Sequence, residues 1–135
     1  MGNGPQQNDI NNFIKANNMK NVFIVPFLER KELFPLIKAC SSFITLSKED
    51  IYGHVINESL SQGIPVISSS KVVAAKSLIQ NNKNGFVVNL NDEEILKAID
   101  DVLSLNCFKE AIAVAKKNTY EGSASIHVKL WKEEI

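Results

Sequence analysis

Cysteine is scarce in this sequence, which contains only Cys40 and Cys107 among its 135 residues. Two isolated cysteines cannot form the disulfide framework of a small secreted domain, and their spacing matches no metal-binding motif. Cys40 falls in an apolar pattern of helical period, so we expect a buried thiol there. This cysteine usage favours a reducing cytoplasm over secretion.

The sequence also lacks an excess of charge and any long apolar run. Lys and Arg number 15 and Asp and Glu also number 15, so no net field recruits nucleic acid or an anionic membrane. No apolar run approaches the roughly 20 residues that cross a bilayer. The start, Met1-Gly2-Asn3-Gly4, lacks the charged and apolar regions of a signal peptide. We therefore expect a cytoplasmic protein that does not bind nucleic acid.

What is present is the composition of one soluble globular domain, with 44% apolar and 22% charged residues. Apolar runs rich in β-branched residues alternate with amphipathic stretches, which favours an α/β fold with a parallel sheet covered by helices on both faces. Strands are expected at 21–26, 42–46, 65–68 and 86–89. Helices are expected at 6–18, 30–39, 53–62, 73–80, from an Asn91 cap onward, at 108–117 and at 123–133.

The most informative segment runs from Asp50 through Tyr52 and Gly53 to Glu58 and ends in a Gly63-Ile64-Pro65 stop. It predicts a loop beyond the carboxyl end of a strand, followed by a helix whose N-terminus suits a phosphate. Eight helical positions span roughly 12 Å, whereas the two carboxyls of a glycoside hydrolase lie about 5–9.5 Å apart. We therefore expect Asp50 and Glu58 to hold opposite ends of an extended ligand.

This segment resembles the signature of the group 1 glycosyltransferases, retaining enzymes of two Rossmann-like domains (the GT-B fold) that bind the donor between them. The signature reads Glu, any residue, Phe, Gly, four residues, Glu-Ala, then a short helix ending in Gly-x-Pro-Val. Asp50, Tyr52 and Ser59 depart from it, and the matching positions are Gly53, Glu58, Gly63, Pro65 and Val66. Further segments resemble the family in the same order: Gly2-Asn3-Gly4-Pro5, Asn21-Val22-Phe23-Ile24, Ser42 to Ser47, and Asn84-Gly85-Phe86-Val87-Val88.

The resemblance begins inside a domain. The family's donor-binding domain opens with a strand, a cationic Arg…Lys-Gly loop, a helix and a second strand, and this sequence resembles the part of the domain after that second strand. Residues 1–135 thus resemble an N-terminally truncated C-terminal domain, a partial nucleotide-sugar-binding domain whose Rossmann-like sheet is incomplete. The two missing strands would lie between 21–26 and 42–46. We therefore expect either an altered strand pairing or self-association through exposed sheet edges.

The resemblance assigns roles to both acids of the motif. Glu58 would accept hydrogen bonds from the ribose hydroxyls of the donor. Asp50 would be the catalytic residue, orienting the donor sugar and stabilising an oxocarbenium-like state. Two other interpretations stay open: Glu58 as an exposed helix glutamate, and Asp50 as the partner of Ser47 in a capping box.

The remaining donor-binding residues of the resemblance act mostly through their backbone. Ile51 and Tyr52 would offer N–H groups, and Gly53 would let the backbone approach the diphosphate. Gly53 could equally be a glycine that only the turn requires. Pro26 and Phe27 stand where the family's loop passes the nucleobase.

The implied reaction transfers a hexose from a nucleotide-sugar, UDP- or GDP-hexose, to a saccharide or lipid acceptor with retention, in polysaccharide, capsule or glycolipid synthesis. No metal or other cofactor is implied. The absent N-terminal domain would bind the acceptor, and the full-length protein would be cytoplasmic or peripheral at the inner face of the membrane. Without the cationic loop, the isolated chain is expected to be inactive. A sugar-nucleotide epimerase domain and a non-catalytic α/β binding module remain as alternatives.

Overall fold

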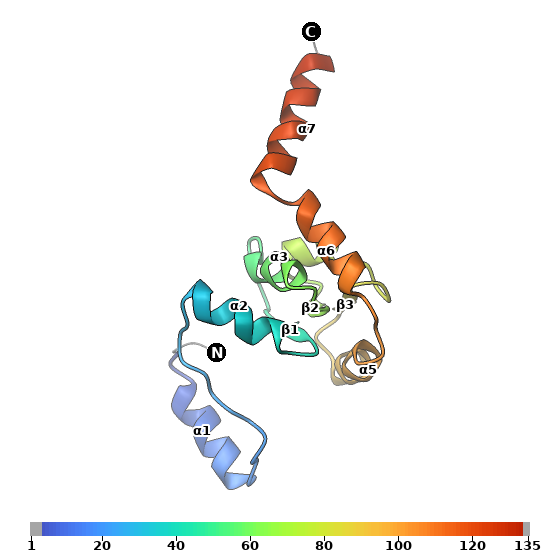
Figure 1. The fold of residues 1–135 in the computed structure, drawn as a ribbon. Helices are drawn as coiled ribbons and strands as arrows, with labels where there is room; N and C mark the ends of the chain where they lie inside the picture. Colours follow the sequence, from blue (N-terminus) through green and yellow to red (C-terminus); the bar gives the residue numbers. More distant parts are fainter. Residues whose placement is uncertain (1–3, 134–135) are drawn as a thin grey trace. The chain divides into compact units, whose positions relative to one another are not determined.

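A computed structural model of the chain describes residues 4–133, so Gly2 and Asn3 of the predicted first turn lie outside the described residues. The chain divides into two compact units, Met1–Leu33 and Phe34–Ile135. None of the described helices is both long and apolar enough to cross a membrane. The elements are arranged in this order: α1 (Gln7–Ala16), α2 (Arg30–Lys38), β1 (Phe43–Thr45), α3 (His54–Ser61), β2 (Val66–Ser69), α4 (Val73–Leu78), β3 (Gly85–Val88), α5 (Asp92–Val102), α6 (Phe108–Lys117) and α7 (Tyr120–Glu133) (Figure 1).

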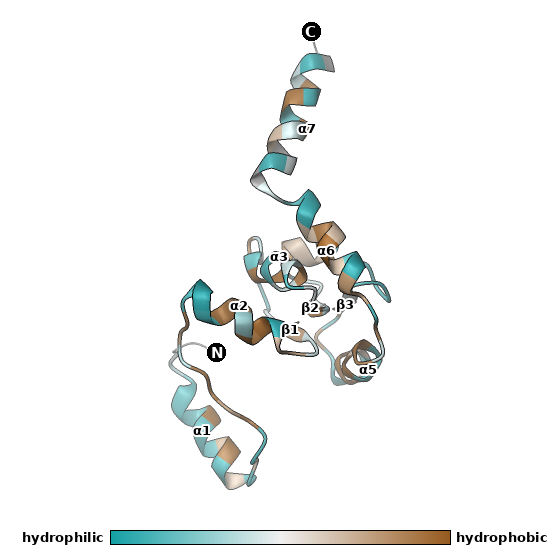
Figure 2. Cartoon of the chain, in the orientation of Figure 1, coloured by the Kyte–Doolittle hydropathy of each residue, from teal (hydrophilic) through white to brown (hydrophobic). Residues whose placement is uncertain are grey.

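The first unit contains α1, a segment without regular structure and the first turn of α2. α1 forms within the range predicted for a helix, and Figure 2 shows apolar and polar residues mixed along it. Ile10 and Phe13, two residues of its apolar face, are 49% and 59% exposed. No residue in the described range 4–33 is fully buried, so this unit contains no hydrophobic core of its own.

Residues 21–26, predicted to be a buried strand, form no strand. Val22 and Phe23 within this segment are 42% and 79% exposed. A strand of a parallel sheet is stabilised by hydrogen bonds to its neighbour and by burial of both faces. Within the described residues, this segment has no neighbouring strand to pair with and is not buried on both faces. The prediction was wrong because an apolar, β-branched run reports a local preference that only a partner strand can satisfy.

The second unit is built on a parallel three-stranded sheet in the order β1-β2-β3. In the registers of the central strand β2, Val66 pairs with Phe43 of β1 and with Gly85 of β3. The three strands lie within one residue of their predicted bounds, which confirms the predicted parallel sheet. Among residues 4–133 no strand pairs with the outer edge of β1, where Ile44 is 41% exposed.

Helices cover both faces of this sheet, as predicted (Figure 1). Val66 and Ile67 are neighbours on β2, so their side chains point to opposite faces. Val66 joins a core cluster with α3, α4 and α6 that includes Leu60. Ile67 joins a second cluster, which includes Val102 of α5. Because all four side chains are at most 1% exposed, the sheet is buried from both sides.

The start of α5 is tied to the end of β3. The Asn91 side chain accepts a hydrogen bond from the Glu94 N–H at 2.9 Å, which confirms the predicted cap. The Glu94 carboxylate accepts one from the Asn89 N–H at 2.8 Å, and others from the Asn89 and Asn91 amides at 3.0 Å each. These hydrogen bonds, that of the Asn89 N–H foremost, lower the pKa of Glu94 below its ordinary value.

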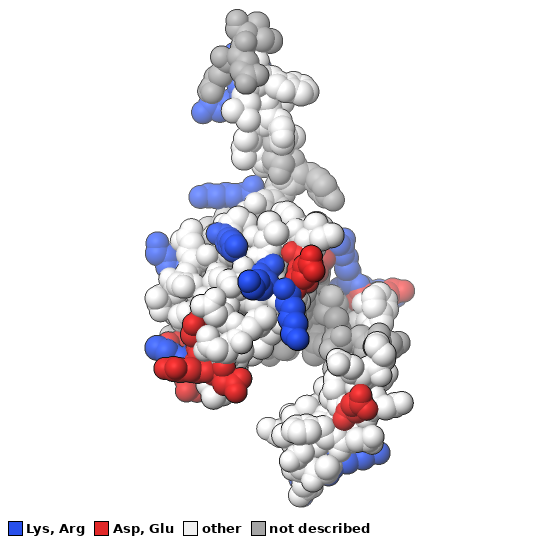
Figure 3. Space-filling model, turned by 180° about the vertical axis from the view of Figure 1, so that it is seen from behind, with Lys and Arg blue, Asp and Glu red and all other residues white. Residues whose placement is uncertain are grey.

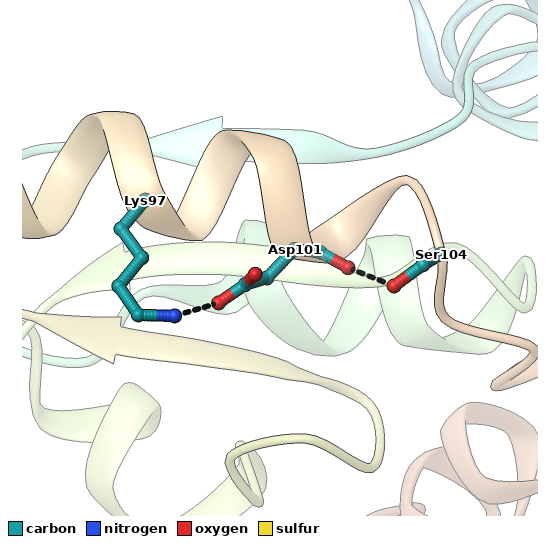
Figure 4. A network of polar contacts seen from close by, with 3 residues as sticks. All are labelled: Lys97, Asp101 and Ser104. Carbon is teal, nitrogen blue, oxygen red and sulfur yellow. Dashed lines mark hydrogen bonds and ion pairs between the residues drawn. The ribbon is translucent and has the colours of Figure 1, made fainter.

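Polar contacts also close the other end of α5. Lys97 Nζ pairs with Asp101 Oδ2 at 2.5 Å, and Ser104 Oγ donates to the Asp101 carbonyl at 2.7 Å (Figure 4). Acidic side chains outnumber basic ones on α5. Figure 3, which views the molecule from behind, shows acidic side chains gathered at the lower left of the second unit. An exposed ion pair contributes at most about 1 kcal/mol to the free energy of unfolding. These contacts therefore help to end the helix but add little to the stability of the core.

The two cysteines lie in different surroundings. Cys40 is exposed, contrary to the prediction, because α2 ends at Lys38 and Cys40 lies beyond the helix. Its Sγ donates to the Leu36 carbonyl at 3.3 Å. Cys107 is 3% exposed, and burial, followed by the charge of Glu110, raises the pKa of its thiol.

Candidate functional site

The Asp50–Gly53 loop lies beyond the carboxyl end of β1 and leads into α3. Ligands of open parallel sheets bind at this end of the strands. α3 covers His54–Ser61, one residue shorter at each end than predicted. The motif found in the sequence therefore occupies the position in which such sheets carry their ligand-binding loops.

Two backbone contacts attach this loop to the segment after β2. Asp50 forms an isolated parallel bridge with Val72, and the Ala74 N–H donates to the Tyr52 carbonyl at 2.8 Å. Val72 and Ala74 are 0% and 1% exposed, so the loop is anchored on the core. Neither residue was predicted from the sequence to belong to the site. Both residues follow the strand next to β1 in the sheet. Because the carboxyl ends of adjacent parallel strands meet at the same edge of a sheet, this position in the sequence could have predicted their contact with the motif loop.

The carboxylate of Asp50 turns back onto its own loop. Oδ1 accepts a hydrogen bond from the Tyr52 N–H at 3.0 Å, which makes an Asx turn. The alternative interpretation, a capping box with Ser47, is wrong because α3 begins only at His54 and the bridge to Val72 holds Asp50 outside any helix. A carboxylate has two acceptor oxygens, so the turn leaves acceptor capacity on Asp50.

Gly53 stands at the N-cap of α3 in a left-handed conformation, with φ 82° and ψ 51°. A Cβ atom added there would lie 2.5 Å from Cγ1 of Val72 and 3.6 Å from Cβ of Ala74. Both the turn and the packing therefore require glycine. This geometry supports the interpretation of Gly53 as a turn glycine, and its approach to a diphosphate stays a prediction.

Ile51 and Tyr52 are the exposed residues of the loop, at 90% and 44% of their surface. The Tyr52 ring lies beside the His54 ring, with centroids 4.5 Å apart and planes tilted by 41°. The Tyr52 N–H, predicted to meet the diphosphate, donates to Asp50. It could serve a phosphate only if the Asx turn opened.

The N-terminus of α3 has the character of an anion site. Helix geometry leaves the first N–H groups without intrahelical partners. No side chain among the described residues caps this helix, and its first turn contains no acidic residue. The N–H groups of His54 and Val55 therefore lie at the positive end of the helix dipole, and Asp50, the acid of the preceding loop, is bonded to the Tyr52 N–H.

Glu58 lies one turn further along α3 and is half-buried. It shares a stripe of the helix with His54 and Ser61, which are both exposed. Ile56 and Leu60 face the core at 0% exposure. Only the part of the motif from His54 onward is helical, so the rough span estimated for eight helical positions does not apply.

One loop and one helix bring together most of the predicted site residues, Asp50–Gly53 and Glu58. Pro26 and Phe27 belong to the first unit, where both are exposed. Their contact with a nucleobase stays a prediction.

Two hollows described in the second unit lie away from the motif loop. One of about 290 Å³ is lined by α3 and α6 and includes Asn57, whose Nδ2 donates to the Asn118 carbonyl at 3.3 Å. The other, of about 240 Å³, is lined by β3 and α5 and by Asn81 and Asn82. Neither is lined by the Asp50–Gly53 loop or by Glu58.

The chain matches the family described as "Glycosyl transferases group 1" over residues 1–121. Among curated proteins it is similar to the "Lipopolysaccharide core biosynthesis glycosyltransferase LpsE" of Rhizobium meliloti (strain 1021), with 28% identity over 92 residues. That alignment covers 67% of this chain and 27% of the relative.

Solved structures share the fold. The apo form of the lipopolysaccharide outer core galactosyltransferase WaaB aligns with a TM-score of 0.84 and 13% identity, over 99% of this chain and 40% of that one. Anabaena Alr3699/HepE, in complex with UDP and glucose, aligns with a TM-score of 0.71 and 18% identity, over 99% and 39%. The chain therefore spans between a quarter and two fifths of the length of these proteins.

Proposed function

The chain belongs to the group 1 glycosyltransferases, and we propose that it is the donor-binding part of a retaining enzyme of this family. The whole protein would transfer a hexose from UDP- or GDP-hexose to a saccharide or lipid acceptor, in polysaccharide, capsule or glycolipid synthesis. A separate N-terminal domain would bind the acceptor. The protein would work in the cytoplasm, at the inner face of the membrane where the acceptor is a lipid.

The N-terminus of α3 is the observation that carries this proposal. It lies after the carboxyl end of a parallel strand, is entered through a left-handed glycine, and has no acidic residue in its first turn. The diphosphate would accept hydrogen bonds from the N–H groups of His54 and Val55, and the helix dipole would favour its charge.

The two acids of the motif would hold the two sugars of the donor. Glu58 would accept hydrogen bonds from both ribose hydroxyls, because ionised carboxylate oxygens are acceptors only. Asp50 would accept from hydroxyls of the hexose through Oδ2, while Oδ1 stays in the Asx turn with Tyr52. The turn would orient the carboxylate before the donor arrives, which is the arrangement that favours catalysis.

Transfer builds negative charge on the departing diphosphate and positive charge on the hexose. The α3 dipole would stabilise the first and the Asp50 carboxylate the second. No metal or other cofactor takes part in this proposal. Because preorganised cations are a large part of such stabilisation and the family's cationic loop has no counterpart in the sequence, we expect no measurable turnover by the isolated chain.

Titration of the chain with UDP, GDP and ADP, followed by NMR, tests the proposal. UDP or GDP should shift the amide signals of His54 and Val55 at millimolar concentration. Glu58→Ala should weaken binding about tenfold. Glu93→Ala, on the first turn of α5, is the matched control and should bind as the unmodified chain does.

Two results would contradict the proposal. Amide signals of α3 that stay unmoved by every nucleotide would remove the donor site. Nucleotide release from a UDP- or GDP-hexose by the isolated chain would disprove its predicted inactivity.

A further inference from the structure

We propose that Ser69, the last residue of β2, and Val72, shortly after it, are positioning residues that hold the Asp50–Gly53 loop in the shape that binds the donor. The donor part of this inference rests on the proposed function. The structural part does not, because it concerns only how the segment after β2 holds the Asp50–Gly53 loop in place. Neither residue belongs to the motif that identified the site.

Ser69 ties the segment after β1 to the end of β2. It is 0% exposed, and its Oγ donates to the Ser47 carbonyl at 2.5 Å. The same oxygen accepts a hydrogen bond from the Lys71 N–H at 3.3 Å. One buried hydroxyl thus joins residues that are 22 positions apart and uses both its donor and its acceptor capacity.

Val72 continues this attachment into the motif loop. Its backbone forms the bridge with Asp50, and its 0% exposed side chain lies against Gly53. Two residues later, the Ala74 N–H donates to the Tyr52 carbonyl. The loop is therefore held at both of its ends and from its buried side.

Asp50 and the first turn of α3 depend on the placement of this loop. If Ser69 loses its hydroxyl, the Ser47 carbonyl loses a buried partner, and the segment that leads to Asp50 can shift against the sheet. The consequence reaches Asp50, which would hold the hexose, and the N–H groups of His54, which would hold the phosphate. Ser69 would then affect donor binding without touching the donor.

Ser70 provides a matched control in the same loop. Its Oγ lies next to Asn89 Oδ1 at 3.2 Å, so it points to the end of β3 and not to the motif. Removal of this hydroxyl changes the same loop by the same chemical group but leaves the Ser69–Ser47 contact in place.

The experiment compares Ser69→Ala, Ser69→Thr and Ser70→Ala in the whole chain by NMR, first without ligand and then with UDP and GDP. Ser69→Ala should shift the amide signals of Tyr52 and His54 and weaken nucleotide binding roughly three- to tenfold. Ser69→Thr keeps the hydroxyl but adds a methyl group to a packed site, so it should bring both the amide signals and the binding closer to those of the unmodified chain than Ser69→Ala does. Ser70→Ala should shift signals near Asn89 only.

The inference is overturned if Ser69→Ala leaves the Tyr52 and His54 amides unmoved, or if Ser70→Ala disturbs them equally. Should Ser69→Ala fail to fold, Val72→Ala carries the same test, because it removes the methyl groups that face Gly53. If the unmodified chain binds neither nucleotide, the proposed function fails. The amide signals of the free chain then still decide whether Ser69 fixes the loop.

Discussion

Replacement of Gly53 by alanine tests how the candidate site is built. The new Cβ would lie 2.5 Å from Cγ1 of Val72, a distance that real Cβ atoms essentially never show. Val72 is 0% exposed, so it has no open space into which it can turn. In addition, φ of 82° at Gly53 is strained for any side chain.

The two effects can be estimated separately. A non-glycine residue in the left-handed region costs about 1–2 kcal/mol, and an extra methyl in a packed core costs about 1–3 kcal/mol. We therefore expect Gly53→Ala to lower the free energy of unfolding by roughly 2–5 kcal/mol.

Urea denaturation followed by circular dichroism measures this loss, and two further variants separate its parts. Gly63→Ala is the matched control, since φ is 78° and the added Cβ meets the ring of Phe108, which is 58% exposed and can move aside. It should lose only about 1–2 kcal/mol. The double variant Gly53→Ala/Val72→Ala should lose about 1–3 kcal/mol less free energy of unfolding than the two single variants lose together. The reason is that the Val72 methyl group that would overlap the new Cβ is then absent.

Strictly additive effects of the Gly53 and Val72 substitutions would refute this reasoning. They would mean that Gly53 does not pack on Val72, and that the left-handed turn alone accounts for the glycine. The backbone contacts between the motif loop and the segment after β2 would remain, but the packing of Gly53 on the Val72 side chain would be disproved.

Three further predictions concern the second unit. Because the pKa of Glu94 is lowered on folding, its contribution to stability is present above the ordinary glutamate pKa and is lost as pH falls through the lowered one. The urea concentration at the unfolding midpoint should therefore decrease less between neutral pH and about pH 3 in Glu94→Gln than in the unmodified chain. In the control, Glu93→Gln, it should decrease as in the unmodified chain. A thiol reagent should modify exposed Cys40 at once but Cys107, 3% exposed, only after unfolding, and two equally fast native thiols would contradict this. Asn84 is 1% exposed and bonds two backbone groups at 2.7 and 2.9 Å, so Asn84→Ala should lose about 2–4 kcal/mol in urea denaturation, and a loss below about 1 kcal/mol would disagree.

Features fixed by neighbouring residues were predictable from the sequence. Asn91 caps α5 because its side chain needs only the N–H three residues later. Gly63 adopts φ of 78° after α3, the conformation expected of a glycine that ends a helix. The strands at β1, β2 and β3 and the helices between them are predictable from local periodicity for the same reason.

Features that depend on distant partners were not predictable. The run 21–26 has the residues of a strand, but whether it becomes one depends on a partner strand that the described residues do not supply. Cys40 continues the apolar helical pattern of α2, yet the helix stops at Lys38 and leaves the thiol exposed. A pattern shows what a segment prefers, whereas burial depends on what the rest of the chain places against it.

Asp50 shows how these two kinds of information combine at the candidate site. The local pattern Ser47 to Asp50 indicates a helix start, but Asp50 instead bridges to Val72, which is 0% exposed, and stays outside any helix. The helix then begins at His54, and the Asp50 carboxylate is left to turn back on Tyr52. The Asx turn orients the carboxylate locally, whereas the position of its backbone is tied to Val72, 22 positions further along the chain and outside the motif around Asp50. A variant of Val72 or Ser69 should therefore alter donor binding even though the motif itself is intact.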